Sequence, residues 1–337
     1  MKKIVTLGEV LLRLSTNVGE RLSQADQLTM HYGGAEANVS VSLSNFGYDV
    51  YLISKIPDNP LTNGVENHLR ANGVRTDYLI KGGERLSTYY LETGVGQRSG
   101  KVTYDRKFSS VSKLTVEEID LENIFTDTEL FHVSGITPAL SQELRDLTLY
   151  ALKRAKEKGI RTSFDFNYRS KLWSQEKAAE SFKRFLPYVD ICFCGELDAI
   201  HFLGIKKLDE SMDKREKLKI YYEKIKAMYP NIEAISSTFR EVVSASANNL
   251  QGNLYVNGIL YQSENYHIDH IVDRVGGGDA FAAGVLYGLM EKMDFQETIS
   301  FATAGSLLKH TIHGDCNVFS KEEIYAFVES ESSKINR

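Results

Sequence analysis

A run of three glycines followed by an acid, near the end of the chain, is the segment best suited to chemistry. Residues 273–284 read DRVGGGDAFAAG, and an apolar helical pattern continues to about Met290. Glycines before a helix let unpaired backbone N–H groups face a ligand, and together with the helix dipole they form an anion site. Asp279 would repel a resting phosphate there, but it could accept a proton from a hydroxyl while the amides stabilise a transferring phosphoryl group. The alternative is that Asp279 only caps the helix.

A second glycine pair, near the start of the chain, also precedes a helical pattern. Residues 33–40 read GGAEANVS, and Gly47 follows. Gly33 and Gly34 would let the backbone approach a ligand closely, and the Asn38 amide could hydrogen-bond a hydroxyl. The alternative is an ordinary turn with Asn38 on a solvated face, because two adjacent glycines alone are weak support for a site.

The elements between these two segments alternate, as in βαβ units around a mostly parallel sheet. Apolar, β-branched runs predict strands at 4–7, 50–56, 130–134, 161–166, 190–194 and 234–238. Helical patterns predict helices at 35–46, 61–72, 142–158, 176–186 and 215–229. Strands that are apolar along most of their length indicate helices on both faces of the sheet. The fold class is therefore α/β.

Two segments interrupt this alternation. Residues 86–106 contain two alternating runs around a glycine-rich turn, which predicts a hairpin, and residues 10–30 are also non-helical. We expect them either to form a small sheet beside the main domain or to be a simple edge hairpin. A further β-rich stretch at 242–271 is expected to complete an edge of the main sheet.

Composition excludes several classes of protein. The 337 residues are 42% hydrophobic and 25% charged, and 40 Lys+Arg against 45 Asp+Glu leave a net charge of −5. Scattered charge without a basic patch argues against nucleic-acid binding, and no apolar run approaches the ~20 residues of a membrane helix. Three cysteines make no disulfide framework, so a cytoplasmic location is expected. Cys192 and Cys194 are expected to face opposite sides of a strand, without a metal.

Together, the two glycine segments resemble the signatures of the ribokinase (PfkB) family of sugar kinases. The first signature, GG-x-x-x-N-x-S, matches residues 33–40, and the second, D-x-x-G-x-G-D, matches residues 273–279. The resemblance implies one ribokinase-like domain over residues 1–337, a three-layer sandwich with a small β-sheet lid from segments at about 10–32 and 86–107. It also implies ATP-dependent phosphorylation of a sugar-like hydroxyl, with Asp279 as general base and the amides of Gly276, Gly277 and Gly278 as the anion hole.

The resemblance further implies ATP and Mg²⁺ as cofactors, with Gly276, Gly278, Thr238 and Arg240 at the nucleotide. The chain departs from the family at Arg274, where relatives usually have threonine, and at 236–241, where relatives have a glycine-containing turn. Gly195 and Asp198 stand where the family has the Asn and Glu of a magnesium-associated motif. No metal ligand is therefore assigned, because Mg²⁺ can arrive on the nucleotide phosphates with few protein ligands.

The substrate is predicted from arginines and tyrosines of the lid and of a strand end. Arginine pairs with a carboxylate through both oxygens, so two converging arginines favour a sugar acid over a neutral sugar. Within the family the chain is most similar to 2-keto-3-deoxygluconate kinases, which implies transfer to the primary hydroxyl and a 6-phospho product. The residues expected to hold the substrate are Gly33, Gly34, Asn38, Tyr90, Tyr104, Arg106, Arg169 and Asp279.

Three alternatives remain open from the sequence. The first is a fructokinase or ribokinase acting on a neutral sugar, and the second is a non-catalytic sugar-binding protein. The third is a Rossmann dehydrogenase, which the first strand disfavours because it leads to GEV instead of GxGxxG. A homo-oligomer, most simply a dimer through the lid sheet, is expected because an exposed sheet edge readily pairs with a second copy.

Overall fold

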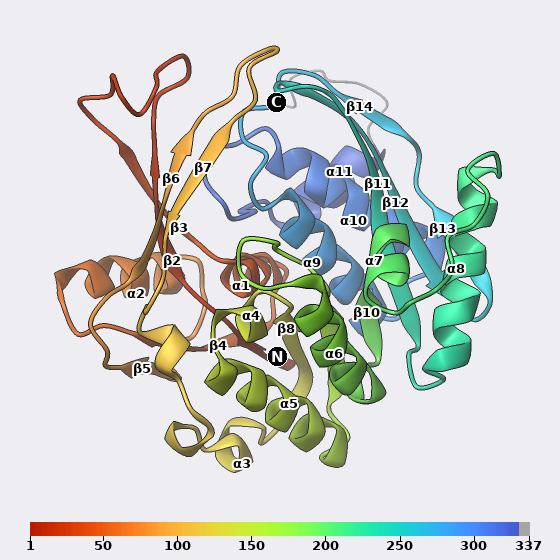
Figure 1. Ribbon diagram of the computed structural model, residues 1–337, viewed down its shortest axis with the longest axis horizontal. Helices are drawn as coiled ribbons and strands as arrows, with labels where there is room; N and C mark the ends of the chain where they lie inside the picture. The colour runs from red at the N-terminus through yellow and green to blue at the C-terminus, as the bar shows by residue number, and fades with distance from the viewer. Residues whose placement is uncertain (330–337) are drawn as a thin grey trace.

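The fold is built on a ten-stranded sheet, seen in a computed structural model that describes residues 1–329 (Figure 1). Residues 330–337 of the expected single domain lie outside this range. The strand order is β13-β12-β11-β10-β9-β8-β1-β4-β5, and β14 pairs with β12. The pairs from β5 to β11 are parallel, and those that β12 makes are antiparallel. The strands are β1 (Lys3–Leu7), β4 (Asp49–Ile56), β5 (Leu79–Lys81), β8 (Thr128–Ser134), β9 (Arg161–Asp165), β10 (Ile191–Phe193), β11 (Ala234–Ser244), β12 (Ala247–Val256), β13 (Ile259–Gln262) and β14 (Tyr266–Ile268).

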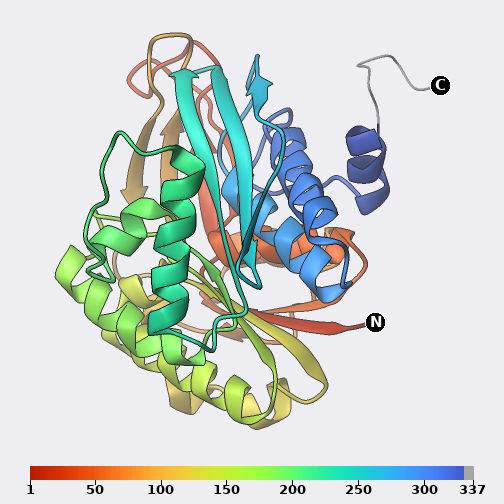
Figure 2. The same ribbon diagram turned by 90° about the vertical axis from the view of Figure 1, so that its right-hand side faces the viewer.

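Helices cover both faces of this sheet, which makes three layers (Figure 2). One face packs against α3 (Leu121–Ile124), α5 (Gln142–Glu157), α6 (Gln175–Phe185) and α8 (Lys214–Met228). The other packs against α1 (Ala35–Asn45), α9 (Gly277–Met290), α10 (Phe295–Lys309) and α11 (Lys321–Glu329). The short helices α4 (Thr137–Leu140) and α7 (Glu196–His201) follow β8 and β10. The predicted α/β sandwich is confirmed, and burial of both sheet faces explains why many of its strands are apolar along most of their length.

A second, four-stranded sheet stands apart from the first (Figure 1). Its order is β3-β2-β6-β7, from β2 (Leu11–Ser15), β3 (Thr29–Gly33), β6 (Ser87–Glu92) and β7 (Lys101–Asp105). These strands come from the two segments that interrupt the βαβ pattern. Helix α2 (Pro60–Ala71) packs Val65 and Leu69 against Leu12 of this sheet and Leu52 of the large one.

Two sequence expectations differ from the structure. The strand expected to end at Thr238 continues to Ser244 and forms a long hairpin with β12, because every residue from Ala234 to Val242 pairs with β12 and no glycine interrupts them. Cys192 and Cys194 do not face opposite sides of β10. Both lie in the core on the α5 side, and Phe193 lies on the α9 side. A strand repeats every two residues, so positions 192 and 194 must share a face.

Within residues 1–329, no helix combines the length and the apolar character that crossing a membrane requires.

Candidate active site

The glycine run predicts a site at the N-terminal end of α9, and the structure places Gly276, Gly277 and Gly278 there. Gly276 is the residue before the helix, and Ala280 is the first residue whose amide donates within it, to the Gly276 oxygen at 2.9 Å. The amides of Gly277, Gly278 and Asp279 therefore belong to the first turn, where a helix has no internal acceptors. With the positive end of the helix dipole, they form a place where an anion is stabilised.

The three glycines differ in what surrounds them. Gly276 has φ 81° in the left-handed region, and a Cβ on it would overlap the backbone oxygen of Asp315. A Cβ on Gly277 would lie 2.6 Å from the ring of His310. A Cβ on Gly278, in contrast, would meet no heavy atom within 4 Å. The side of the run at Gly276 and Gly277 is thus filled by other protein atoms, and the side at Gly278 is open.

Asp279 and Asn38 meet, although 241 positions separate them. Asn38 Nδ2 donates to Asp279 Oδ2 at 2.6 Å, and helices α1 and α9 pack side by side to allow it. Gly34, the residue before α1, has φ 147°, and a Cβ there would also overlap the backbone oxygen of Glu9. A Cβ on Gly33 would meet the side chain of Asp315. The first glycine pair therefore permits close packing of protein against protein at the edge of the site.

Asp279 is an unusual carboxyl. Burial raises its pKa to about 7, against the opposing effects of the Asn38 hydrogen bond and of the positive charge of Arg169. The negative charges of Glu36 and Asp315 raise it further. A carboxyl that exchanges its proton near neutral pH is suited to general base catalysis.

Two further half-buried carboxyls, Asp165 and Asp198, belong to the same region, and sequence reasoning gave them no role. Burial raises the pKa of Asp165 to about 8, and the negative charges of Asp279 and Asp198 add to this effect. Burial also raises the pKa of Asp198 to about 6, against the hydrogen bond that it accepts from Gly195 N. A usable signal existed for Asp165, because it ends a buried parallel strand, and ligands bind at the carboxyl ends of such strands.

The predicted arginines outside the small sheet are exposed. Arg169 follows β9 and acts electrostatically on both Asp279 and Asp165, so it lies at the site. Burial lowers the pKa of His310, whose ring abuts Gly277, and the positive charge of Arg240 on β11 lowers it further. Thr238 lies two residues before Arg240 and pairs with Gly252 across the β11–β12 ladder.

The register of the small sheet decides which tyrosine shares a face with Tyr104. Tyr104 pairs directly with Tyr89, and their ring centroids are 5.8 Å apart, so these two share a face. Tyr90 pairs with Thr103 and lies on the opposite face. The structure therefore brings Tyr104 and Tyr89 together and does not bring Tyr90 to them.

Arg106 is buried and only partly satisfied. Its Nη2 pairs with the carboxylate of Glu9, which also accepts hydrogen bonds from Ser87 and from Ser109. Its guanidinium stacks over the Tyr104 ring at 5.1 Å. The side chain is only 8% exposed, and its buried Nε atom has no hydrogen-bond partner within residues 1–329. A buried charged donor without an acceptor is costly, and a ligand oxygen would remove that cost.

The residues at the family's magnesium-associated motif are engaged within the protein. Asp198 Oδ2 accepts a hydrogen bond from Gly195 N at 2.8 Å, and Glu196 pairs with Lys217 at 3.4 Å. Over the described chain, no three His, Cys, Asp or Glu side chains are grouped as a metal site.

Fold and site together define a phosphoryl-transferring carbohydrate kinase, and comparison with known proteins identifies the family. The pfkB family carbohydrate kinase model matches residues 1–321, so the chain belongs to this family. It is 43% identical to the solved structure of a 2-dehydro-3-deoxygluconokinase from Thermotoga maritima, with a TM-score of 0.94 over 98% of this chain and 100% of that one. It is also 32% identical to a 2-dehydro-3-deoxygalactonokinase of Haloferax volcanii over 99% of both chains. A 2-dehydro-3-deoxygluconokinase of Bacillus subtilis is 26% identical, over 97% of this chain and 95% of that protein.

Proposed function

We propose that this carbohydrate kinase transfers the γ-phosphoryl group of ATP to the primary hydroxyl of 2-keto-3-deoxygluconate, giving the 6-phospho sugar acid. The observation that carries the proposal is the half-buried Asp279, hydrogen-bonded to Asn38 at 2.6 Å beside the open amides of α9. Asp279 would supply a proton acceptor, and the amides would supply an anion site next to it. The names of the relatives support the substrate class.

The transfer follows from this geometry. Asp279 accepts the hydroxyl proton while the hydroxyl oxygen forms a bond to the γ-phosphorus, and the bond from that phosphorus to the ADP oxygen breaks. Asn38 holds Asp279 in place through its amide. The amides of Gly277 and Gly278 face the charge that develops on the phosphoryl oxygens, and Gly276 sets the turn that aims them. Arg240, near His310, is proposed to contact the nucleotide phosphates together with Thr238.

Magnesium fits the oxygen-rich surroundings of Asp279, because it prefers carboxylate, phosphate and water oxygens. When bound, it neutralises charge on the nucleotide phosphates. Mg²⁺ would bind those phosphates, and Asp165, one of the carboxyls that interact electrostatically with Asp279, would be available to hold it.

A sugar acid accounts best for the arginines. A substrate oxygen can satisfy the buried Nε of Arg106, whose other side is neutralised by Glu9. Arg169 is exposed, and we propose that it pairs with the substrate carboxylate. Tyr104, stacked with Arg106, would pack against the sugar, with the small sheet as a lid that excludes water. Gly33 and Gly34 act by allowing this close packing.

The test is ADP release with Mg-ATP against 2-keto-3-deoxygluconate, its galactonate epimer, fructose and ribose. We expect kcat/KM for the gluconate acid to exceed that for each neutral sugar by well over tenfold, about 1.4 kcal/mol. Preference for fructose or ribose would overturn the sugar-acid assignment. Preference for the galactonate epimer would correct only the epimer.

The arginine assignment has a matched control. Arg169→Met should lower kcat/KM for the keto acid by about 10- to 100-fold, the effect of one charge-assisted contact, and should leave a slow neutral sugar unchanged. The control is Arg215→Met. Arg215 is an exposed arginine of α8 whose Nη2 donates to the Leu260 oxygen. An equal loss for acid and neutral substrates would contradict the carboxylate role.

We also propose a dimer formed through the small sheet. Met30 on its edge strand β3 and Phe108 just beyond β7 are 51% and 76% exposed, which is unusual for large apolar side chains. The mass of the protein in solution, measured by light scattering, should be twice that of the chain, and Phe108→Lys should lower it.

A further inference from the structure

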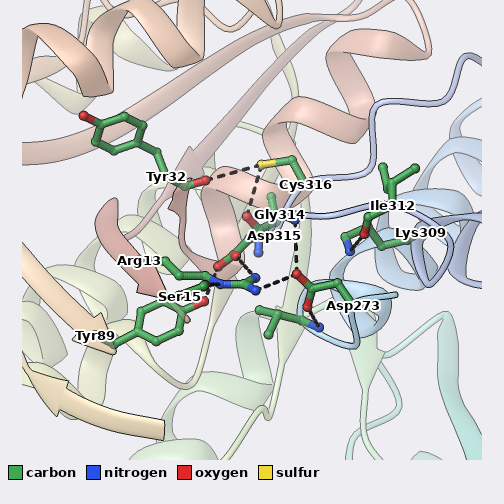
Figure 3. Close-up of polar contacts among 12 residues, drawn as sticks. Arg13, Ser15, Tyr32, Tyr89, Asp273, Lys309, Ile312, Gly314, Asp315 and Cys316 are labelled. Carbon is green, nitrogen blue, oxygen red and sulfur yellow. Dashed lines mark hydrogen bonds and ion pairs between the residues drawn. The ribbon is translucent and has the colours of Figure 1, made fainter. Parts of the chain in front are cut away.

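A cluster of buried charges joins the small sheet to the segment that precedes the anion hole, and none of its members takes part in the proposed transfer. Arg13 of β2 lies between two carboxylates (Figure 3). Its Nη2 is 2.6 Å from Asp273 Oδ2, and its Nη1 is 2.7 Å from Asp315 Oδ1. The three side chains are no more than 4% exposed. Arg13 Nε donates to Ser15 Oγ at 2.6 Å, so each nitrogen of the guanidinium is engaged.

A second strand of the small sheet is attached to the same carboxylate. Tyr89 of β6 is the paired neighbour of Arg13, and its hydroxyl donates to Asp315 Oδ2 at 2.6 Å (Figure 3). The two oxygens of Asp315 therefore hold β2 and β6 at once. A charged pair buried this deeply cannot separate without leaving unpaired charge in the interior.

The other side of the cluster shapes the turn that leads into α9. Asp273 Oδ1 accepts a hydrogen bond from Val275 N at 3.1 Å, and its Oδ2 accepts one from Gly314 N at 3.1 Å. The backbone oxygen of Asp315 fills the space beside Gly276. The residues that hold the small sheet thus also set the backbone that aims the anion hole.

A fourth charge completes the cluster from α10. The Lys309 side chain is fully buried, its Nζ donates to the Ile312 oxygen at 3.3 Å, and Asp273 and Asp315 act on it electrostatically. Two positive and two negative groups therefore balance, which makes their burial tolerable.

The far end of the small sheet is attached much more weakly. Ala245 N, in the β11–β12 turn, donates to the Gly96 oxygen at 2.7 Å, and Gly96 N donates to Ser246 Oγ at 3.4 Å. Between this contact and the charge cluster lies a cleft of about 840 Å³ lined by both sheets. The groups of the Gly96–Ala245 contact are half-buried, so water can replace their hydrogen bonds. The charges of the cluster are buried, so water cannot replace their partners.

We propose that the Arg13–Asp273–Asp315–Tyr89 cluster is a fixed pivot that positions the small sheet and the anion hole relative to each other. Arg13 and Asp315 are then positioning residues for phosphoryl transfer, and the sheet opens and closes at its tip, at the Gly96–Ala245 contact. This inference rests on the proposed role of the sheet as a lid over Asp279.

The test compares Asp315→Asn with Asp190→Asn. Asp190 is an equally buried carboxylate that pairs with Lys156 and accepts hydrogen bonds from Thr162, but it lies outside the small sheet and the site. Hydrogen exchange in β2, β6 and the central strand β8 is measured without ligands, and kcat and the ratio of ADP to phosphorylated sugar are measured with them. Tyr89→Phe, which removes a single hydroxyl, serves if Asp315→Asn does not fold.

For Asp315→Asn we expect faster exchange in β2 and β6 than in β8, a fall in kcat of about 10-fold or more, and a ratio above one because water reaches the nucleotide. Tyr89→Phe should show the same selective exchange to a smaller extent, and Asp190→Asn should leave the ratio at one. Wild-type exchange in the small sheet, or an equal increase in all three strands, would overturn the pivot. Selective exchange with unchanged kcat and ratio would overturn the positioning role. The exchange data do not depend on the substrate, so they separate this inference from failure of the proposed function.

Discussion

The N-terminal end of α9 has two sides, and they are built in opposite ways. On one side, Gly276 and Gly277 pack so closely against Asp315 and His310 that neither has room for a Cβ. On the other side, Gly278 faces open space, and Asp279 carries a pKa raised by burial. The filled side has its charges paired, whereas the open side keeps unpaired amides and a carboxyl of altered acidity. The difference shows that one glycine run combines closely packed backbone with backbone that faces open space.

Replacing the carboxyl on the open side should have the largest effect on turnover. Asp279→Asn removes the proton acceptor, so we expect kcat to fall by about 10³-fold with little change in the KM for the sugar. The same variant should unfold at a higher temperature at pH 8, because the folded protein no longer buries an ionised carboxylate. Steady-state kinetics and thermal unfolding measure the two effects. Near-normal kcat would remove Asp279 as the base.

Adding one methyl group on each side tests the comparison directly. Gly276→Ala places a Cβ in the left-handed region and against Asp315, and should lower the free energy of unfolding by at least ~2 kcal/mol. Gly278→Ala has room for its Cβ and should change the unfolding free energy by less than about 1 kcal/mol. Denaturant titration measures both. Similar losses in the two variants would mean that the sides do not differ in packing.

The pH dependence of turnover isolates the open side. Asp279 acts as a base only when it is deprotonated, so kcat/KM should fall about tenfold for each pH unit below about pH 7. The charged groups around it are Arg169, Glu36 and Asp315. The folded pKa lies above the unfolded one, so between about pH 4 and 7 the folded state binds more protons. The contribution of this group to stability therefore falls as pH rises through that window. A flat rate profile from pH 5 to 8 would contradict the assignment.

The smallest effect on turnover is expected from replacing Cys316, which contacts the Asn38 side chain beside Asp279. Its Sγ lies 3.3 Å from Asn38 Oδ1, which leaves the Asn38 Nδ2 free to donate to Asp279. His68 Nε2 at 3.6 Å and the Tyr32 oxygen at 3.9 Å are its other neighbours. Cys316→Ala should lower kcat by only about 2- to 3-fold, because a thiol is a weak donor. Cys316→Ser, which restores a hydroxyl donor, should recover wild-type kcat.

Periodicity and glycine spacing were enough to predict the layers, the parallel strands and the segments of the small sheet. They failed where the pattern itself was ambiguous. The strand β11 runs beyond Thr238 because its partner β12 continues to pair with it, and no local signal ends it. Tyr89 and Tyr90 are adjacent in the sequence, and only the register with β7 decides which of them shares a face with Tyr104.

The sequence by itself determined that unpaired amides and a carboxyl lie together at residues 276–279. A glycine run before an acid means unpaired amides beside a carboxyl in almost any fold that places a helix there. The tertiary structure alone decided what that chemistry works with. Arg13 stands in an apolar strand, and Asp315 follows a glycine at the end of the chain. Neither shows its role until folding brings them together, because a buried ion pair between residues 302 positions apart has no local signature.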